Sequence, residues 1–228
     1  VVYFPNPTTA MNMVIRSLDL DQNDEVLSSN HEYGAVERTW KFMSSKKGFK
    51  YIPIDIALPF NEDDFIDKFQ KNISNKTKII FLSHITSPTG IIFPIKKICN
   101  LAHDLDIMVI IDGAHAPAQI DLNLSTLGAD IYTGACHKWM CAPKGTSFLY
   151  AKKEIQDFID PLVISWGYDN DEPIDLLADM TSHSKYLNYH QWQGTQDPSS
   201  YLTIPDVINF LNNNNWGKVS KDCCKLNI

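Results

Sequence analysis

The chain has 228 residues, of which 44% are hydrophobic and 21% charged, a composition typical of a folded globular protein and unlike disordered or collagen-like chains. The formal net charge of −7 argues against nucleic-acid binding, which needs a basic face. No apolar run approaches the roughly 20 residues that span a bilayer, and the first residues lack the pattern of a signal peptide, so we expect a cytoplasmic protein that does not contact membranes.

Helix-like and strand-like segments alternate along the first two thirds of the chain. Amphipathic spacing and capping residues predict helices at 8–20, 32–48, 61–73 and 95–106. Short apolar runs predict strands at 24–30, 49–55, 77–85, 107–112, 129–135 and 146–151. This alternation predicts an α/β fold with three layers, α/β/α, around a mostly parallel sheet.

The last third is less regular. After Tyr150 the sequence favours loops and short elements up to Gln196, and then a helix from residue 205 that runs into a tail rich in Asn and Lys. We therefore expect one large domain over 1–210 and a tail over 211–228. Five cysteines are an odd number without the spacing of a disulfide framework, which favours reduced thiols.

Polar residues follow several predicted strands at the point where each strand ends. Ligands bind at the carboxyl ends of parallel strands, so these residues should share one edge of the sheet. The residues are Tyr33 after the first strand, Ser87 after "IIFLSHI" and Asp112 at the end of "IMVIID", with Thr8 and Thr9 at the start of the first helix.

Asp112 and Lys138 are the strongest candidates for chemistry. A carboxylate at the end of an apolar strand must be paired or hydrogen-bonded to stay ionised; it either caps the next segment or faces a cationic partner such as a protonated pyridine nitrogen. A lysine sheltered at the end of "ADIYTGA" would have a lowered pKa and become a nucleophile or a base. The hydroxyls in "PNPTTAMN" are either a helix cap or part of a phosphate site.

Six ordered segments carry a family resemblance: "NPTTAMN", "HEYGAVERTW", "SHITSPTGIIFPI", "DGAH", "HKW" and "QGTQDPSSYLTIP". With them the chain resembles the class V aminotransferase family of pyridoxal-phosphate enzymes, of fold type I. Within that family it is most similar to the isopenicillin N epimerase-like branch, which is related to the cysteine desulfurases. The resemblance implies the large cofactor-binding domain of fold type I and the cofactor pyridoxal 5'-phosphate.

The resemblance also implies roles for single residues. Lys138 would form the internal aldimine with the cofactor, Asp112 would pair with its ring nitrogen, and His115 would bond its ring hydroxyl. The other implied cofactor contacts are Thr8, Thr9 and His137 at the phosphate, Tyr33 stacked on the ring, Ser87 near the ring hydroxyl or substrate, and Thr195 at the phosphate of the opposite subunit. A shared site of that kind requires a homodimer.

The implied function is a reaction at Cα of an amino acid or small peptide, with epimerisation or C–S cleavage as the outcome. Relatives carry a further N-terminal segment and a small C-terminal domain with a substrate-binding arginine, neither of which matches this sequence. The alternative is therefore a truncated, inactive fragment that binds the cofactor or a partner. A metal hydrolase built on Asp112, His115 and His137 is a third hypothesis.

Overall fold

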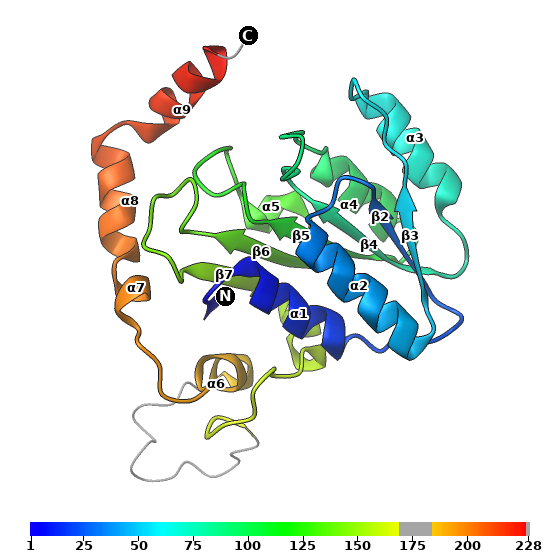
Figure 1. Ribbon diagram of the computed structural model, residues 1–228, viewed down its shortest axis with the longest axis horizontal. Coiled ribbons are helices and arrows are strands. Elements are labelled where there is room, and N and C mark those ends of the chain that lie inside the picture. The colour runs from blue at the N-terminus through cyan, green and yellow to red at the C-terminus, as the bar shows by residue number, and fades with distance from the viewer. Residues whose placement is uncertain (169–183, 227–228) are drawn as a thin grey trace.

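The computed structural model describes residues 1–168 and 184–226. Its centre is a seven-stranded sheet with the strand order β1-β7-β6-β5-β4-β2-β3 (Figure 1). The strands are β1 (Val2–Phe4), β2 (Glu25–Ser29), β3 (Lys50–Ile54), β4 (Thr77–Ser83), β5 (Met108–Gly113), β6 (Ile131–Ala135) and β7 (Ser147–Ala151). The six predicted strands are thus all present.

Five neighbouring strands, β3, β2, β4, β5 and β6, run parallel, while β7 pairs antiparallel with β6 and β1 pairs antiparallel with β7. The parallel pairs place Ser83 beside Asp112 and Asp112 beside Thr133. The predicted mostly parallel sheet is confirmed, and its carboxyl ends meet at one edge. Strand β1 has three residues and was missed by the sequence analysis.

Helices cover both faces of the sheet, as predicted, and so make three layers (Figure 1). The helices of the first two thirds are α1 (Pro7–Ser17), α2 (Gly34–Lys47), α3 (Glu62–Asn72), α4 (Ile95–His103) and α5 (Leu124–Leu127). Local signals set their ends: the Asn6 side chain accepts from the Thr9 N–H at the start of α1, and Gly48 adopts a left-handed φ of 89° at the end of α2.

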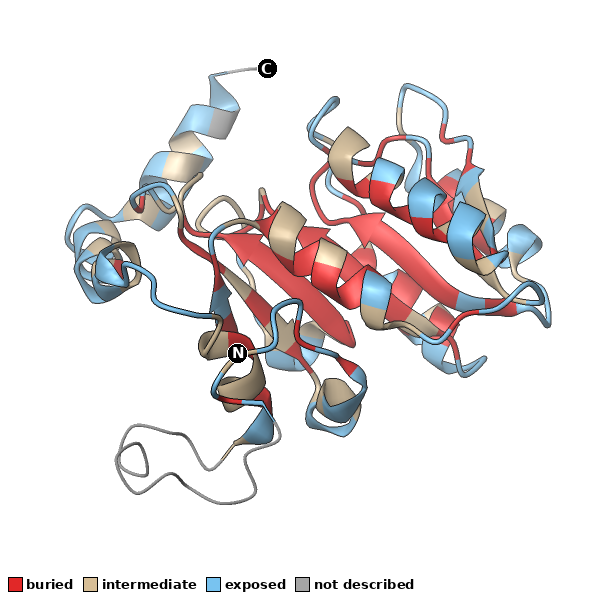
Figure 2. Cartoon of the chain, turned by 60° about the horizontal axis from the view of Figure 1, so that its bottom comes forward, coloured by how far each residue is buried: buried red, intermediate tan, exposed pale blue. Residues whose placement is uncertain are grey.

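The apolar core lies on the two faces of the sheet, because successive strand residues point to opposite sides. In β5, Ile110 packs in the cluster that contains α1 and α2, and Ile111 packs in the cluster that contains α3 and α4. Both isoleucines are 0% exposed. Figure 2 shows the strands buried and the outer helix faces exposed. The central strands are therefore covered on both sides, which explains their continuous apolar runs.

The C-terminal part contains more helix than the sequence analysis predicted. A 3-10 helix, η1 (Lys153–Phe158), follows β7, and the later helices are α6 (Lys185–Gln191), α7 (Ser199–Leu202), α8 (Ile204–Asn213) and α9 (Trp216–Lys225). The expected tail is thus largely helical, whereas the domain boundary at residue 210 stays a prediction. The indole N–H of Trp216 donates to the Ala118 carbonyl over 2.7 Å and so ties α9 to the loop after β5.

Within residues 1–168 and 184–226, no helix is both long and apolar enough to span a lipid bilayer.

Candidate functional site

A small cavity of about 160 Å³ opens at the carboxyl edge of the parallel strands. Its walls come from the start of α1, from the loops after β2 and β4, and from the segments after β5 and β6. The lining residues are Asn6, Pro7, Thr8, Tyr33, Ser83, Ile85, Ser87, Asp112, Ala114, His115, His137 and Lys138. Seven of the nine predicted site residues therefore meet in one cavity.

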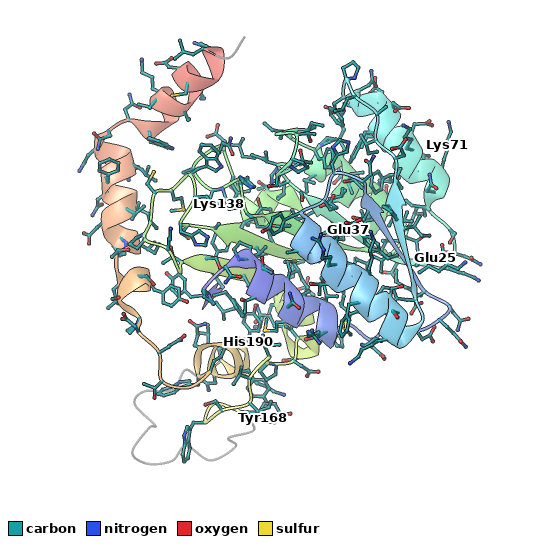
Figure 3. The ribbon with its side chains drawn as sticks, viewed as in Figure 1. Glu25, Glu37, Lys71, Lys138, Tyr168 and His190 are labelled. Carbon is teal, nitrogen blue, oxygen red and sulfur yellow. The ribbon has the colours of Figure 1, made fainter. Side chains whose placement is uncertain are left out.

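Lys138 lies on the turn that follows β6, beyond the carboxyl edge of the sheet (Figure 3). Its Nζ atom lies 2.9 Å from Nε2 of His115. Burial lowers the pKa of Lys138, while the nearby Asp112 carboxylate acts in the opposite direction. A lysine with a lowered pKa holds more neutral amine near neutral pH, which is the form that attacks a carbonyl.

His115 stands between two side chains from the Lys138 turn. The indole N–H of Trp139 donates to Nδ1 of His115 over 3.2 Å, and Nε2 of the same ring faces the lysine amine. Burial, followed by the charge of Lys138, lowers the pKa of His115. The ring is therefore held in position at both of its nitrogen atoms.

Asp112 is the buried carboxylate of the cavity, at 4% exposure. One of its oxygens accepts from the Ala114 backbone N–H over 3.0 Å. Burial raises the pKa of Asp112, and the Ala114 hydrogen bond and the charge of Lys138 oppose that rise. A buried carboxylate with so few partners is stabilised by a bound cation or a protonated ring nitrogen.

The side of the cavity that faces α1 fits an anionic group. The start of α1 offers the positive end of the helix dipole, with Asn6 and Thr8 on the wall. His137 lines the same wall, and its Nδ1 is buried without a hydrogen-bond partner among residues 1–168 and 184–226, so this polar atom is left unsatisfied there. Asn6 was missed by the sequence analysis, although its place before Pro7 is typical of a helix cap.

Thr9 is not part of the cavity wall. Its backbone N–H and its hydroxyl both donate to the Asn6 side chain, at 2.8 and 3.0 Å, so within this chain it serves the helix cap. Thr195 is exposed on the loop between α6 and α7 and does not line the cavity of its own chain. The implied contacts of Thr9 and Thr195 with a phosphate stay predictions.

Glu32 is a buried acid behind the cavity that the sequence analysis did not single out. Its carboxyl accepts from the Ser83 backbone N–H and hydroxyl at 2.7 and 2.6 Å, and it shares a 2.5 Å hydrogen bond with the Ser29 hydroxyl. Burial raises the pKa of Glu32 to about 7, and the charge of Asp112 adds to the rise. Glu32 thus carries a proton up to neutral pH, next to a wall residue, Ser83.

His31 connects the loops that carry Tyr33 and Ser87. Its Nε2 atom lies 2.8 Å from the Ile56 carbonyl oxygen, which can only accept, so Nε2 donates; its Nδ1 atom shares a 3.1 Å hydrogen bond with the Thr89 hydroxyl. The Thr86 and Thr89 hydroxyls are 2.7 Å apart. This chain of hydrogen bonds holds the Ser87 loop against the Tyr33 loop.

Among the described residues, no group of three or more His, Cys, Asp or Glu side chains is placed to hold a metal ion.

Comparison with known proteins gives the following relatives. A family model described as aminotransferase class-V matches residues 1–226. An isopenicillin N epimerase from Streptomyces clavuligerus is 31% identical over 90% of this chain and 52% of its own. A probable chloroplastic L-cysteine desulfhydrase from Arabidopsis thaliana is 26% identical over 91% of this chain and 44% of its own.

A solved structure is also similar: a variant of C-DES with glycine covalently linked to its PLP cofactor. It has a TM-score of 0.70 at 25% identity and covers 85% of this chain and 56% of that chain.

The chain spans about half the length of the curated relatives it matches. The match to the family model nevertheless runs over nearly all of its residues. Sheet order, cavity position and family match agree with one another, and they confirm the family and fold predicted from the sequence. The chain belongs to the class-V aminotransferase family of pyridoxal-phosphate enzymes and has their fold type I architecture.

Proposed function

We propose that this chain binds pyridoxal 5'-phosphate through Lys138 and acts at Cα of an amino acid or small peptide. The observation that carries the proposal is the cavity lined by Lys138, Asp112 and His137, the last of which has a buried Nδ1 without a hydrogen-bond partner among the described residues. These three groups match the aldehyde, the protonated ring nitrogen and the phosphate of that cofactor. The similarity to the Streptomyces epimerase supports the same assignment.

Different residues would contact different parts of the cofactor. The Lys138 amine would hold its aldehyde carbon, Asp112 would accept a hydrogen bond from its ring nitrogen, and His115 would face its ring hydroxyl. His137 and Thr8, at the positive end of the α1 dipole, would hold its phosphate. Tyr33 and Ser87 line the same cavity. The bound cofactor supplies an electron sink for charge that develops at the substrate Cα.

Proton transfer at Cα is assigned to Lys138. With cofactor and substrate bound, the lysine amine would remove the Cα proton and return it. Return on the opposite face inverts the amino acid, as in the epimerase relative, and loss of a sulfur group at Cβ cleaves a C–S bond, as in the desulfhydrase relative. Both outcomes share the removal of the Cα proton.

Thr195 is assigned to a second copy of the chain. It is exposed and lies outside the cavity of its own chain. In a homodimer with a shared site it would contact the phosphate held by the partner. A cytoplasmic location stays a prediction.

The first experiment tests the site of attachment. The purified chain is incubated with pyridoxal phosphate, reduced with borohydride, digested and analysed by mass spectrometry. We expect the cofactor mass on the peptide with Lys138 and its loss in Lys138→Ala, while Lys144→Ala keeps it because Lys144 is exposed on the same loop. Label spread over many lysines, or retained in Lys138→Ala, would refute the proposal.

The second experiment separates an active enzyme from an inactive fragment. Amino acids, including cysteine, are incubated with the cofactor-loaded chain in heavy water, and deuterium at Cα is measured. Lys138-dependent exchange supports the proposed activity. Attachment at Lys138 without any exchange supports the alternative, a fragment that binds the cofactor and does not turn over.

A further inference from the structure

The side chain of Trp139 connects to the reactive lysine through a single histidine. The indole N–H lies 3.2 Å from Nδ1 of His115, and Nε2 of His115 lies 2.9 Å from Nζ of Lys138. Trp139 itself is 44% exposed and does not line the cavity. The binding site proposed above does not use it.

Hydrogen-bond chemistry gives this chain of three residues a direction. An indole N–H can only donate, so Nδ1 of His115 must accept. A neutral imidazole carries one proton, which is then on Nε2, the atom that faces the lysine. An ammonium group has three donors and no acceptor, so it cannot accept from that N–H. Only the neutral amine of Lys138 has a lone pair for this contact.

We propose that Trp139 is a positioning residue that holds His115 in its Nε2–H form and thereby favours the neutral amine of Lys138 before the cofactor arrives. The inference rests on the proposed function, because it concerns the lysine assigned to the cofactor aldehyde. A neutral amine condenses directly with an aldehyde, with loss of one water, whereas an ammonium must first lose a proton.

Of the other influences on the Lys138 amine, some favour its charged form and some its neutral form. Asp112 favours the ammonium by its charge, and burial favours the amine. His137 and Tyr33 line the same cavity, and Glu32 lies beyond Asp112. Burial also lowers the pKa of His115, which keeps its ring neutral. The hydrogen bond of Trp139 therefore acts together with burial in favour of the neutral amine and against the charge of Asp112.

The sequence offers a matched control for the loss of one indole N–H. Trp216 donates to the Ala118 carbonyl over 2.7 Å, outside the cavity. Both Trp139→Phe and Trp216→Phe remove an indole N–H and keep an aromatic ring. Only Trp139→Phe removes the indole N–H that donates to Nδ1 of His115. Replacement of Trp139 by benzothienylalanine is a second test, since it keeps the ring shape and has sulfur in place of N–H.

The experiment uses the chain without cofactor and has two readouts. Nitrogen-15 NMR of the His115 ring at pH 7.5 reports which nitrogen carries the proton. The rate at which trinitrobenzenesulfonate modifies Lys138, followed by mass spectrometry from about pH 6 to 10, reports the neutral amine. In the wild type and in Trp216→Phe we expect His115 in its Nε2–H form. In both chains the rate of Lys138 modification should rise at a lower pH than in Trp139→Phe.

In Trp139→Phe and in the benzothienylalanine chain we expect a mixture of His115 forms and a Lys138 rate about three- to tenfold lower near pH 7, as for one hydrogen bond. Unchanged spectra and rates in these chains, or an equal change in Trp216→Phe, would overturn the inference. The proposed function has a separate test: a Trp139-dependent His115 form with no cofactor on Lys138 would refute the function and leave the inference standing.

Discussion

The cavities at the two edges of the parallel sheet differ in the side chains that line them. At the carboxyl edge, about 160 Å³ is lined by an acid, two histidines and a lysine. At the amino edge, about 440 Å³ is lined mostly by apolar side chains between α1, the strand starts and η1, with Lys78 and three aspartates at its rim. The polar groups converge on the smaller cavity, so the volume of a cavity does not by itself identify the candidate site.

The difference has a physical origin in the strand direction. Parallel strands bring all their carboxyl ends to one edge, where the following loops and the N-terminal ends of helices gather polar groups. Burying those groups without full hydrogen bonding costs stability. The carboxyl edge therefore carries raised carboxyl pKa values at Glu32 and Asp112. Substitutions at the two edges test this contrast.

The largest effect is expected for Glu32→Gln. Burial raises the pKa of Glu32 from 4.5 to about 7, so the native state keeps a proton that the unfolded chain loses. Native stability therefore falls as pH rises from about 4.5 to 7, and a neutral Gln avoids that loss. In urea unfolding, the variant should gain up to about 3 kcal/mol on the wild type at pH 8 and little near pH 4.

Measuring both chains at each pH removes the effects of His84 and His190, whose pKa values burial lowers to about 4. Asp19→Asn at the amino edge is the control, because Asp19 is exposed, and it should change the free energy of unfolding by less than about 0.5 kcal/mol. A gap between wild type and Glu32→Gln that does not grow with pH would contradict the prediction.

The second effect concerns how tightly the carboxyl edge is packed. A Cβ on Gly113 would lie 2.0 Å from Cζ of Tyr132, a fully buried ring whose hydroxyl bonds Nδ1 of His84 over 2.9 Å. Gly113→Ala must displace that ring and should destabilise the protein by roughly 1 to 3 kcal/mol in urea unfolding.

Gly217 is the matched control for Gly113. It lies in α9, and a methyl group on its Cα would meet no other heavy atom within 4 Å, so alanine there should stabilise by roughly 0.5 to 1 kcal/mol. Equal effects at the two positions would show that the carboxyl edge is not the tightly packed one.

The smallest effect tests which cavity takes the cofactor. His137→Ala removes an imidazole at the carboxyl edge whose Nδ1 has no hydrogen-bond partner among the described residues, and it should weaken pyridoxal phosphate binding about tenfold, as for one hydrogen bond to a charged group. Phe158→Ala at the amino edge should leave binding unchanged. Absorbance titration at constant pH measures both. A weaker affinity in Phe158→Ala alone would assign the cofactor to the other edge.

Much of the site follows from local patterns in the sequence. Asp112 ends an apolar strand and Lys138 follows the next one, and parallel pairing of β5 with β6 brings those ends together. Glu32 was missed because its burial depends on Ser83, which lies 51 residues further along the chain. Strand β1 was missed because three residues carry no periodic signal until β7 pairs with them.

The sequence by itself determined the alternation of strands and helices and the residue types at the strand ends, because these depend on neighbours a few positions apart. The tertiary structure decided which groups lose contact with water and which nitrogen of His115 faces Lys138. Those outcomes depend on atoms that the fold brings together from distant segments, such as Trp139 and His115, which are 24 residues apart. Desolvation and hydrogen-bond direction are properties of that assembly, so no local pattern reports them.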